Sequence, residues 1–275
     1  MARVPEGPSP APVVQRLRLR YAKRGRLRFA SHRDFARAFE RALRRAGVPV
    51  AHSAGFSPHP RVSYANAAPT GVASEAEYLE LGLTERCDPE WVREALDAAL
   101  PEGLDILTAV EAGSGALADA LQASLWLVRL PGVRPETAEA GLRLLLAADA
   151  VEVSRMTKNG LRTFDARAAV HTATVVPVEA LEALEALEAL PVAAAGRGQP
   201  TTAPCAILQL VVRHATPAVR PDDVLDALRR VADLTPPAPP EVTRLAQGPL
   251  DEATGTVSDP LHEAGPILAD DAIDP

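Results

Sequence analysis

Two histidines near the amino end of the chain, His32 and His59, have side chains that can do acid–base chemistry. Imidazole changes its charge near neutral pH. A histidine beside a phosphate can therefore assist attack by an RNA 2′-OH while arginines stabilise the developing charge. We predict His32 and His59 as candidate catalytic residues. The alternative is that His59 caps a neighbouring backbone group in a structural turn, and the sequence leaves open whether the two histidines are neighbours.

The stretch HSAGFSPHP, residues 52–60, predicts a stiff loop that presents His59. Its prolines have a fixed φ and push the residue before each of them into extended backbone. Its glycine can turn the chain with a positive φ, and its aromatic ring is expected to anchor the loop in the core. The residues predicted to shape the loop are Gly55, Phe56, Pro58 and Pro60. We interpret His52 as the structural member of the two loop histidines.

The histidine and cysteine pattern predicts neither a metal site nor another cofactor. Three histidines fall within 28 residues, but the sequence has no H-x-x-x-H pair and no Cys/His finger pattern. The two cysteines, Cys87 and Cys205, are far apart. They therefore form no disulfide framework and no cluster for zinc or iron–sulfur. We expect a cytoplasmic protein.

Basic residues are concentrated in one segment of an acidic chain. Residues 16–61 hold 13 Lys and Arg against 2 Asp and Glu, a net charge of +11, whereas residues 62–275 carry −18. Such a segment predicts an anionic partner, and guanidinium groups match phosphates in a bidentate manner. The alternative is internal neutralisation by acidic segments. The residues predicted to bind RNA are Arg24, Arg26, Arg28, Arg33, Arg37, Arg41, Arg44, Arg45 and Arg61.

Residues 31–47, SHRDFARAFERALRRAG, predict an amphipathic helix with a serine N-cap and a closing glycine. Its apolar residues recur at helical spacing and form one stripe. On the other side, Arg37, Arg41 and Arg44 fall at i, i+4 and i+7 and form a continuous ridge. Glu40 can pair with one of these arginines but cannot neutralise them all.

The element order predicts an α+β protein with two tandem ferredoxin-like (βαββαβ) domains, at residues 15–112 and 121–247. In the first domain we expect strands at 16–29, with a turn or bulge possible at residues 23–25, and at 61–67, 77–83 and 104–110, and helices at 31–47 and 88–100. The second repeats the order with an extra strand or two. There we expect strands at 123–130, 151–156, 161–170, 205–214 and 241–247 and helices at 135–148 and 221–233.

Three further segments are expected to carry little structure. Residues 1–14 form a disordered lead, and residues 179–204 form a low-complexity insertion that contains the repeat EALEALEALEAL. Residues 248–275 form an acidic disordered tail, with seven Asp and Glu and no Lys or Arg. No apolar run reaches membrane-spanning length, so we expect no membrane partner.

The chain resembles the radical-SAM-linked proteins, a domain of unknown function that occurs fused behind radical SAM enzymes and also as a separate chain. The resemblance rests on residues 27–81, including the RALRRAG run at 41–47 and the PHP of the loop, and continues more faintly through 158–167 and 220–228. It implies a radical SAM enzyme or a ribonuclease as partner. This chain lacks Cys-x-x-x-Cys-x-x-Cys and therefore looks like the stand-alone form.

These observations favour an RNA-binding accessory protein in tRNA or rRNA modification or processing. Two alternatives remain open. One is an enzyme or enzyme subunit with a histidine-containing site for RNA cleavage or modification, and the other is a protein–protein adaptor. The RNA hypothesis requires that the arginines stay exposed, because pairing with the chain's own carboxylates would remove their positive charge from the surface.

Overall fold

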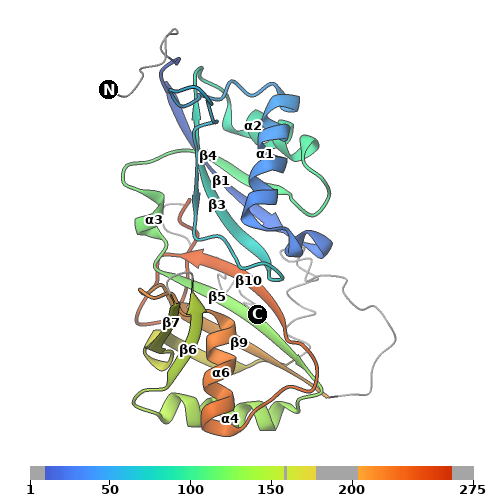
Figure 1. The fold of residues 1–275 in the computed structure, drawn as a ribbon, viewed down its shortest axis with the longest axis vertical. Helices are drawn as coiled ribbons and strands as arrows, with labels where there is room; N and C mark the ends of the chain where they lie inside the picture. The colour runs from blue at the N-terminus through green and yellow to red at the C-terminus, as the bar shows by residue number, and fades with distance from the viewer. Residues whose placement is uncertain (1–9, 158–159, 178–203, 262–275) are drawn as a thin grey trace, which may run out of the picture. The chain divides into compact units, whose positions relative to one another are not determined.

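The computed structural model describes residues 10–157, 160–177 and 204–261. The chain splits into two compact units, residues 1–119 and 120–275, and we describe each by itself (Figure 1). Both units combine α-helices with antiparallel strands. None of the helices in the described ranges has the length and apolar character needed to cross a membrane.

Unit 1 has the element order β-α-β-β-α-β that the sequence predicts. All its strand pairs are antiparallel, and the strands lie in the order β4-β1-β3-β2. The two helices cover one face of this sheet (Figure 1). The elements are β1 (Gln15–Lys23), α1 (His32–Ala46), β2 (Val62–Ala65), β3 (Ala73–Leu83), α2 (Pro89–Ala99) and β4 (Ile106–Glu111).

The core of unit 1 lies between this sheet and the two helices. Leu17, Leu19 and Tyr21 are buried, as the alternation along β1 predicts. They pack with apolar residues of both helices, among them Phe35 and Phe39 of α1. The arginines that alternate with them in β1 therefore point to the other face of the sheet.

Strand β1 ends earlier than the sequence predicts, and the aromatic residue at position 29 lies outside the core as a result. Gly25 has a φ of +53° and starts a 3-10 helix, η1 (Gly25–Phe29). The alternation of strand side chains therefore stops at Lys23. Phe29, which we expected on the apolar face, is 59% exposed.

Helix α1 begins and ends as predicted. The Ser31 hydroxyl accepts a hydrogen bond from the backbone N–H of Asp34, and the Asp34 carboxylate accepts one from the backbone N–H of Ser31. Gly47 ends the helix in the left-handed conformation with a φ of +66°. These local contacts hold the helix in register, so its arginine side chains lie on one defined face.

Unit 2 has a four-stranded antiparallel sheet with the order β10-β5-β9-β8. A separate β6–β7 hairpin is inserted between α4 and β8. The sequence analysis expected one strand over residues 161–170, but the chain forms β7, a short 3-10 turn and then β8. The elements are α3 (Leu117–Ala120), at the boundary of the units, β5 (Ala123–Pro131), α4 (Pro135–Ala147), β6 (Glu152–Thr157), β7 (Gly160–Asp165), η2 (Arg167–Ala169), β8 (Val170–Val175), β9 (Cys205–Arg213), α6 (Pro221–Ala232) and β10 (Glu241–Gly248).

Two segments expected to be disordered are partly folded. The lead is described from residue 10 onward, and the backbone N–H of Val14 donates to the carbonyl of Leu83 at 2.9 Å. The predicted tail is folded over residues 248–261, where Leu250 forms a β-bridge with Val257. The predicted insertion lies outside the described residues except for its last position, as do residues 262–275.

The folded part of the tail contributes to a small apolar cluster, which the acidic composition did not indicate. Val257 is only 4% exposed and packs against Ala123, Val211 and Ala246. The burial of Val257, with Leu250 packed against the same cluster, explains why this segment is folded despite its charge.

We expect Val257→Ala to lower the free energy of unfolding of unit 2 by about 1.5–3 kcal/mol, because it removes two buried methyl groups and leaves a cavity. Urea denaturation followed by the fluorescence of Trp126, in a Trp91→Phe background, measures this. The exposed Leu144 of α4 provides the control, since Leu144→Ala should change stability by less than about 0.5 kcal/mol. Equal effects of the two substitutions would show that the tail does not pack as described.

Candidate nucleic-acid interface

The exposed face of helix α1 carries a row of positive charges. In the described part of the chain, none of these arginines forms an ion pair with a carboxylate within 4 Å. We call this row the α1 arginine ridge, and it consists of Arg33, Arg37, Arg41 and Arg44. The nearest acidic residues in sequence, Asp34 and Glu40, leave the helix with a net positive charge. Asp34 is moreover held in the N-terminal cap.

Arg45, the remaining arginine of α1, points away from the ridge. Its guanidinium donates a hydrogen bond to the backbone carbonyl of Ala99 at the end of α2. Its charge stays partly accessible, but the side chain links the two helices. We therefore treat Arg45 as a structural residue that lies beside the ridge.

The 3-10 turn that precedes α1 adds two further arginines. Arg26 is exposed and has no ion-pair partner in the described residues. Arg28 is half-buried, and its guanidinium carbon lies 4.8 Å from the centroid of the Phe29 ring. The Nε of Arg28 is buried without a hydrogen-bond partner in the described chain. This turn places two cationic groups and one exposed aromatic ring immediately before the first turn of α1.

Two arginines of β1, Arg16 and Arg18, share one carboxylate within unit 1. Arg18 lies directly opposite Glu80 of β3 in the strand register, and both Arg16 and Arg18 form ion pairs with this carboxylate, at 2.8 and 3.4 Å. Arg18 also donates to the backbone carbonyls of Gly113 and Gly115. Arg16 and Arg18 are therefore held by contacts within unit 1, unlike the α1 arginine ridge.

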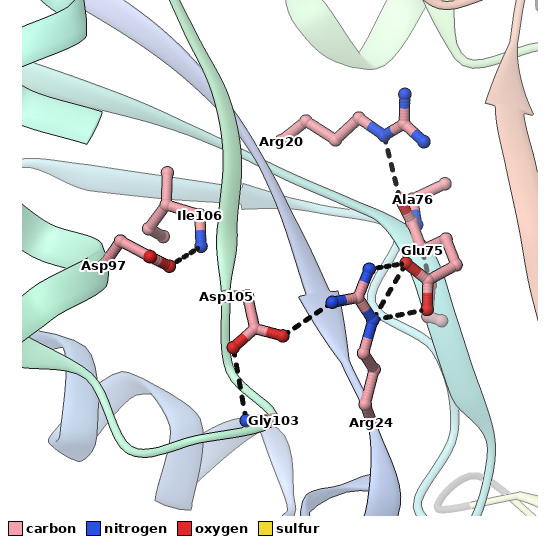
Figure 2. A network of polar contacts seen from close by, with 9 residues as sticks. Arg20, Arg24, Glu75, Ala76, Asp97, Gly103, Asp105 and Ile106 are labelled. Atoms are coloured by element: carbon pink, nitrogen blue, oxygen red, sulfur yellow. Dashed lines mark hydrogen bonds and ion pairs between the residues drawn. The ribbon is translucent and has the colours of Figure 1, made fainter. Parts of the chain in front are cut away.

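Arg24 must be removed from the set of predicted RNA-binding residues. Figure 2 shows its guanidinium between the carboxylates of Glu75 and Asp105, with N–O distances of 2.5 and 2.7 Å. Arg20 donates to the backbone carbonyl of Glu75 at 2.8 Å. Glu75 is 2% exposed, and burial raises its pKa although the hydrogen bond and charge of Arg24 oppose the shift. For Arg24 the alternative of internal neutralisation therefore applies, by two acids that lie more than 50 residues away in sequence.

His32 lies at the first position of α1, exposed to solvent, with its ring edge-on to Tyr64 of β2 at a centroid distance of 4.7 Å. Tyr64 packs in turn against Phe35. Burial, and to a smaller extent the charge of Glu40, raises the pKa of the Tyr64 hydroxyl, which therefore stays protonated. The contact positions the imidazole on the helical side of the sheet.

The proline loop is closed at its base by backbone pairing. His52 and Pro60 form a β-bridge, the backbone N–H of Ser53 donates to the carbonyl of His59, and the backbone N–H of His59 donates to the Ser53 hydroxyl. Gly55 has a φ of +129°, as the loop prediction requires. Phe56, however, is 76% exposed, so the prediction that it anchors the loop in the core is wrong. Hydrogen bonds at the base hold the loop instead.

The loop directs its two histidines to different cavities. His59 lines one of about 310 Å³ together with Arg16, Arg61 and Glu80. His52 lines another of about 210 Å³, beside Glu40 and Arg44 of α1, and also borders a third.

His32 does not line the cavity of His59, nor either of the two cavities that His52 lines. Nor do the described residues contain a group of three or more His, Cys, Asp or Glu side chains arranged to hold a metal ion.

Phe29 was predicted on the apolar face of a strand, but it is exposed on this surface. The available signal was Gly25, which interrupts the alternation of the strand and frees the following residues from the sheet.

Comparison with known proteins adds one finding. The model of DUF2344, an uncharacterized protein family conserved in bacteria, matches residues 16–221. No curated protein matches the chain.

Proposed function

We propose that this chain, which belongs to the DUF2344 family of uncharacterized proteins conserved in bacteria, is an RNA-binding accessory protein. It acts in tRNA or rRNA modification or processing alongside a radical SAM enzyme or a ribonuclease. The partner class follows from the resemblance to radical-SAM-linked proteins. The RNA contact follows from the surface of unit 1.

The observation that carries the proposal is the α1 arginine ridge. Arg16, Arg18 and Arg24 form ion pairs with Glu75, Glu80 or Asp105, whereas the ridge arginines form no ion pair within 4 Å among the described residues. Exposed guanidinium groups suit a nucleic-acid backbone, because each can bind a phosphate through two parallel hydrogen bonds. Arg26 extends the positive surface beyond the amino end of the helix.

We further propose that both units are ferredoxin-like domains. The strand order β4-β1-β3-β2 of unit 1 recurs in unit 2 as β10-β5-β9-β8 when the inserted β6–β7 hairpin is set aside. Each main sheet is antiparallel and carries a helix after its first and third strands. The fold supports several functions, so it adds no argument for RNA by itself.

The positions of His32 and His59 do not support a reaction that needs both histidines in one cavity. His59 shares its cavity with Arg61 and Glu80, whereas His32 packs on Tyr64 on the helical side of the sheet. An adaptor that binds only protein would give a stoichiometric partner in a pull-down that nuclease treatment does not disturb.

Titration of the full-length protein with a transfer RNA, at salt concentrations from about 50 to 200 mM, tests the proposal. We expect the logarithm of the affinity to fall linearly with the logarithm of the salt concentration, because each phosphate contact releases condensed counterions. Fluorescence anisotropy of labelled RNA measures the slope. Absence of binding to transfer RNA, ribosomal RNA fragments and heparin alike at low salt would refute the proposed function.

A further inference from the structure

We propose that the α1 arginine ridge binds single-stranded RNA and that an unpaired base stacks on the ring of Phe29. This inference rests on the proposed function and specifies the class of RNA. It joins three features of one short segment: an exposed aromatic ring, the cationic turn that carries it, and the ridge that follows it in the chain.

Phe29 is held in a defined position although it is exposed. The guanidinium of Arg28 lies over its ring, with the guanidinium carbon 4.8 Å from the centroid. The backbone N–H of Gly71 donates to the carbonyl of Arg28 at 2.8 Å, and Gly71 lies beside the ring, where a Cβ would be at an ordinary van der Waals distance of 3.9 Å. The ring is therefore supported from its own turn and from the 66–72 connection, and more than half of the side chain remains accessible.

The position of this ring suits a nucleic-acid strand. Phe29 is followed by the N-cap of α1 at Ser31 and then by the ridge, which begins at Arg33. A strand whose phosphates contact the ridge can extend toward Arg26 and place a base on the ring. Proteins that bind single strands combine a positive surface with aromatic rings in this way, because every base has a face that can stack.

A duplex does not offer the same contact. Its bases are stacked on one another, and the deep, narrow major groove of A-form RNA does not admit side chains. Duplex RNA would therefore contact the ridge through phosphates alone. The aromatic ring should thus discriminate between the two forms, whereas the arginines should serve both.

The test compares an oligouridine of about 12 nucleotides with an RNA duplex of similar length, using the full chain. Phe29→Leu keeps an apolar side chain and removes the aromatic face, so we expect affinity for the single strand to fall by about tenfold. Affinity for the duplex should change by less than about twofold. Phe29→Trp should retain single-strand affinity, and its added fluorescence should be quenched by oligouridine.

Phe56→Leu is the matched control, because it makes the same change at the other exposed phenylalanine of unit 1. An equal loss at Phe56, or a loss at Phe29 that is the same for duplex and single strand, would overturn the inference. If the wild-type protein binds RNA and Phe29→Leu binds oligouridine equally well, the inference fails while the proposed function stands. If the wild-type protein binds no RNA, both fail.

Discussion

Replacement of Arg37 and Arg41 by glutamate lowers the affinity for RNA by about tenfold or more at low salt, and it lowers the salt slope by about one for each phosphate contact that is lost. Both side chains are exposed on the α1 arginine ridge and lack an ion pair in the described chain, so the double variant changes the surface charge without breaking an internal contact. Electrophoretic mobility shifts or fluorescence anisotropy at several salt concentrations measure both quantities.

Arg143→Glu supplies the control for this prediction. Arg143 is exposed on α4 in unit 2, where its only described ion pair is a contact of 3.9 Å with Glu139. A reversal there changes the net charge of the protein but leaves the ridge intact, so RNA affinity should fall by much less. If the loss of RNA affinity per reversed charge is the same for Arg143→Glu as for the ridge variant, RNA binding depends on net charge alone and the ridge is not the binding site.

The second large effect concerns stability. Arg24→Met lowers the free energy of unfolding of unit 1 by about 3–5 kcal/mol near neutral pH, because it leaves the buried carboxylate of Glu75 without its cationic partner. Glu75 is 2% exposed, and its carboxylate oxygens accept three hydrogen bonds from this guanidinium. Urea denaturation followed by Trp91 fluorescence, in a Trp126→Phe background, measures the change.

The effect of Arg24→Met depends on pH in a defined direction. Burial already holds the pKa of Glu75 above its ordinary value of 4.5 in the wild-type protein, and loss of Arg24 removes an attraction that lowers it. The folded variant therefore binds the Glu75 proton more tightly than the unfolded chain over a wider pH range. Protonation of Glu75 stabilises the folded variant to its full extent below the pKa of Glu75 in the unfolded chain. This stabilisation is lost as the pH rises through the pKa of Glu75 in the folded variant. The penalty of the variant is accordingly larger at about pH 7 than at about pH 5.

The double variant Arg24→Met/Glu75→Met separates this account from a loss of packing. Replacement of a buried pair by apolar side chains of similar volume is often neutral or stabilising, so we expect the double variant to recover most of the lost free energy. A penalty for Arg24→Met that is independent of pH, or a double variant no more stable than the single one, would contradict the description in Figure 2.

Much of unit 1 could be predicted from local spacing. The serine N-cap, the apolar stripe and the closing glycine of helix α1 all involve residues within a few positions of one another, and the structure confirms each of them. The β-α-β-β-α-β order was predicted for the same reason. The single strand predicted over residues 161–170 was wrong, because the 3-10 turn Arg167–Ala169 separates β7 from β8.

The sequence by itself determined where arginines accumulate and which of them share a helical face. Only the tertiary structure decided which charges remain at the surface. Arg24, for example, is neutralised by Glu75 and Asp105, which are 51 and 81 residues away in sequence and are brought beside it by strand pairing. It likewise separated His32 from the cavity of His59 and left Phe29 exposed. Local periodicity sets the direction of a side chain along its own element, whereas burial and charge compensation depend on the neighbours that folding brings to it.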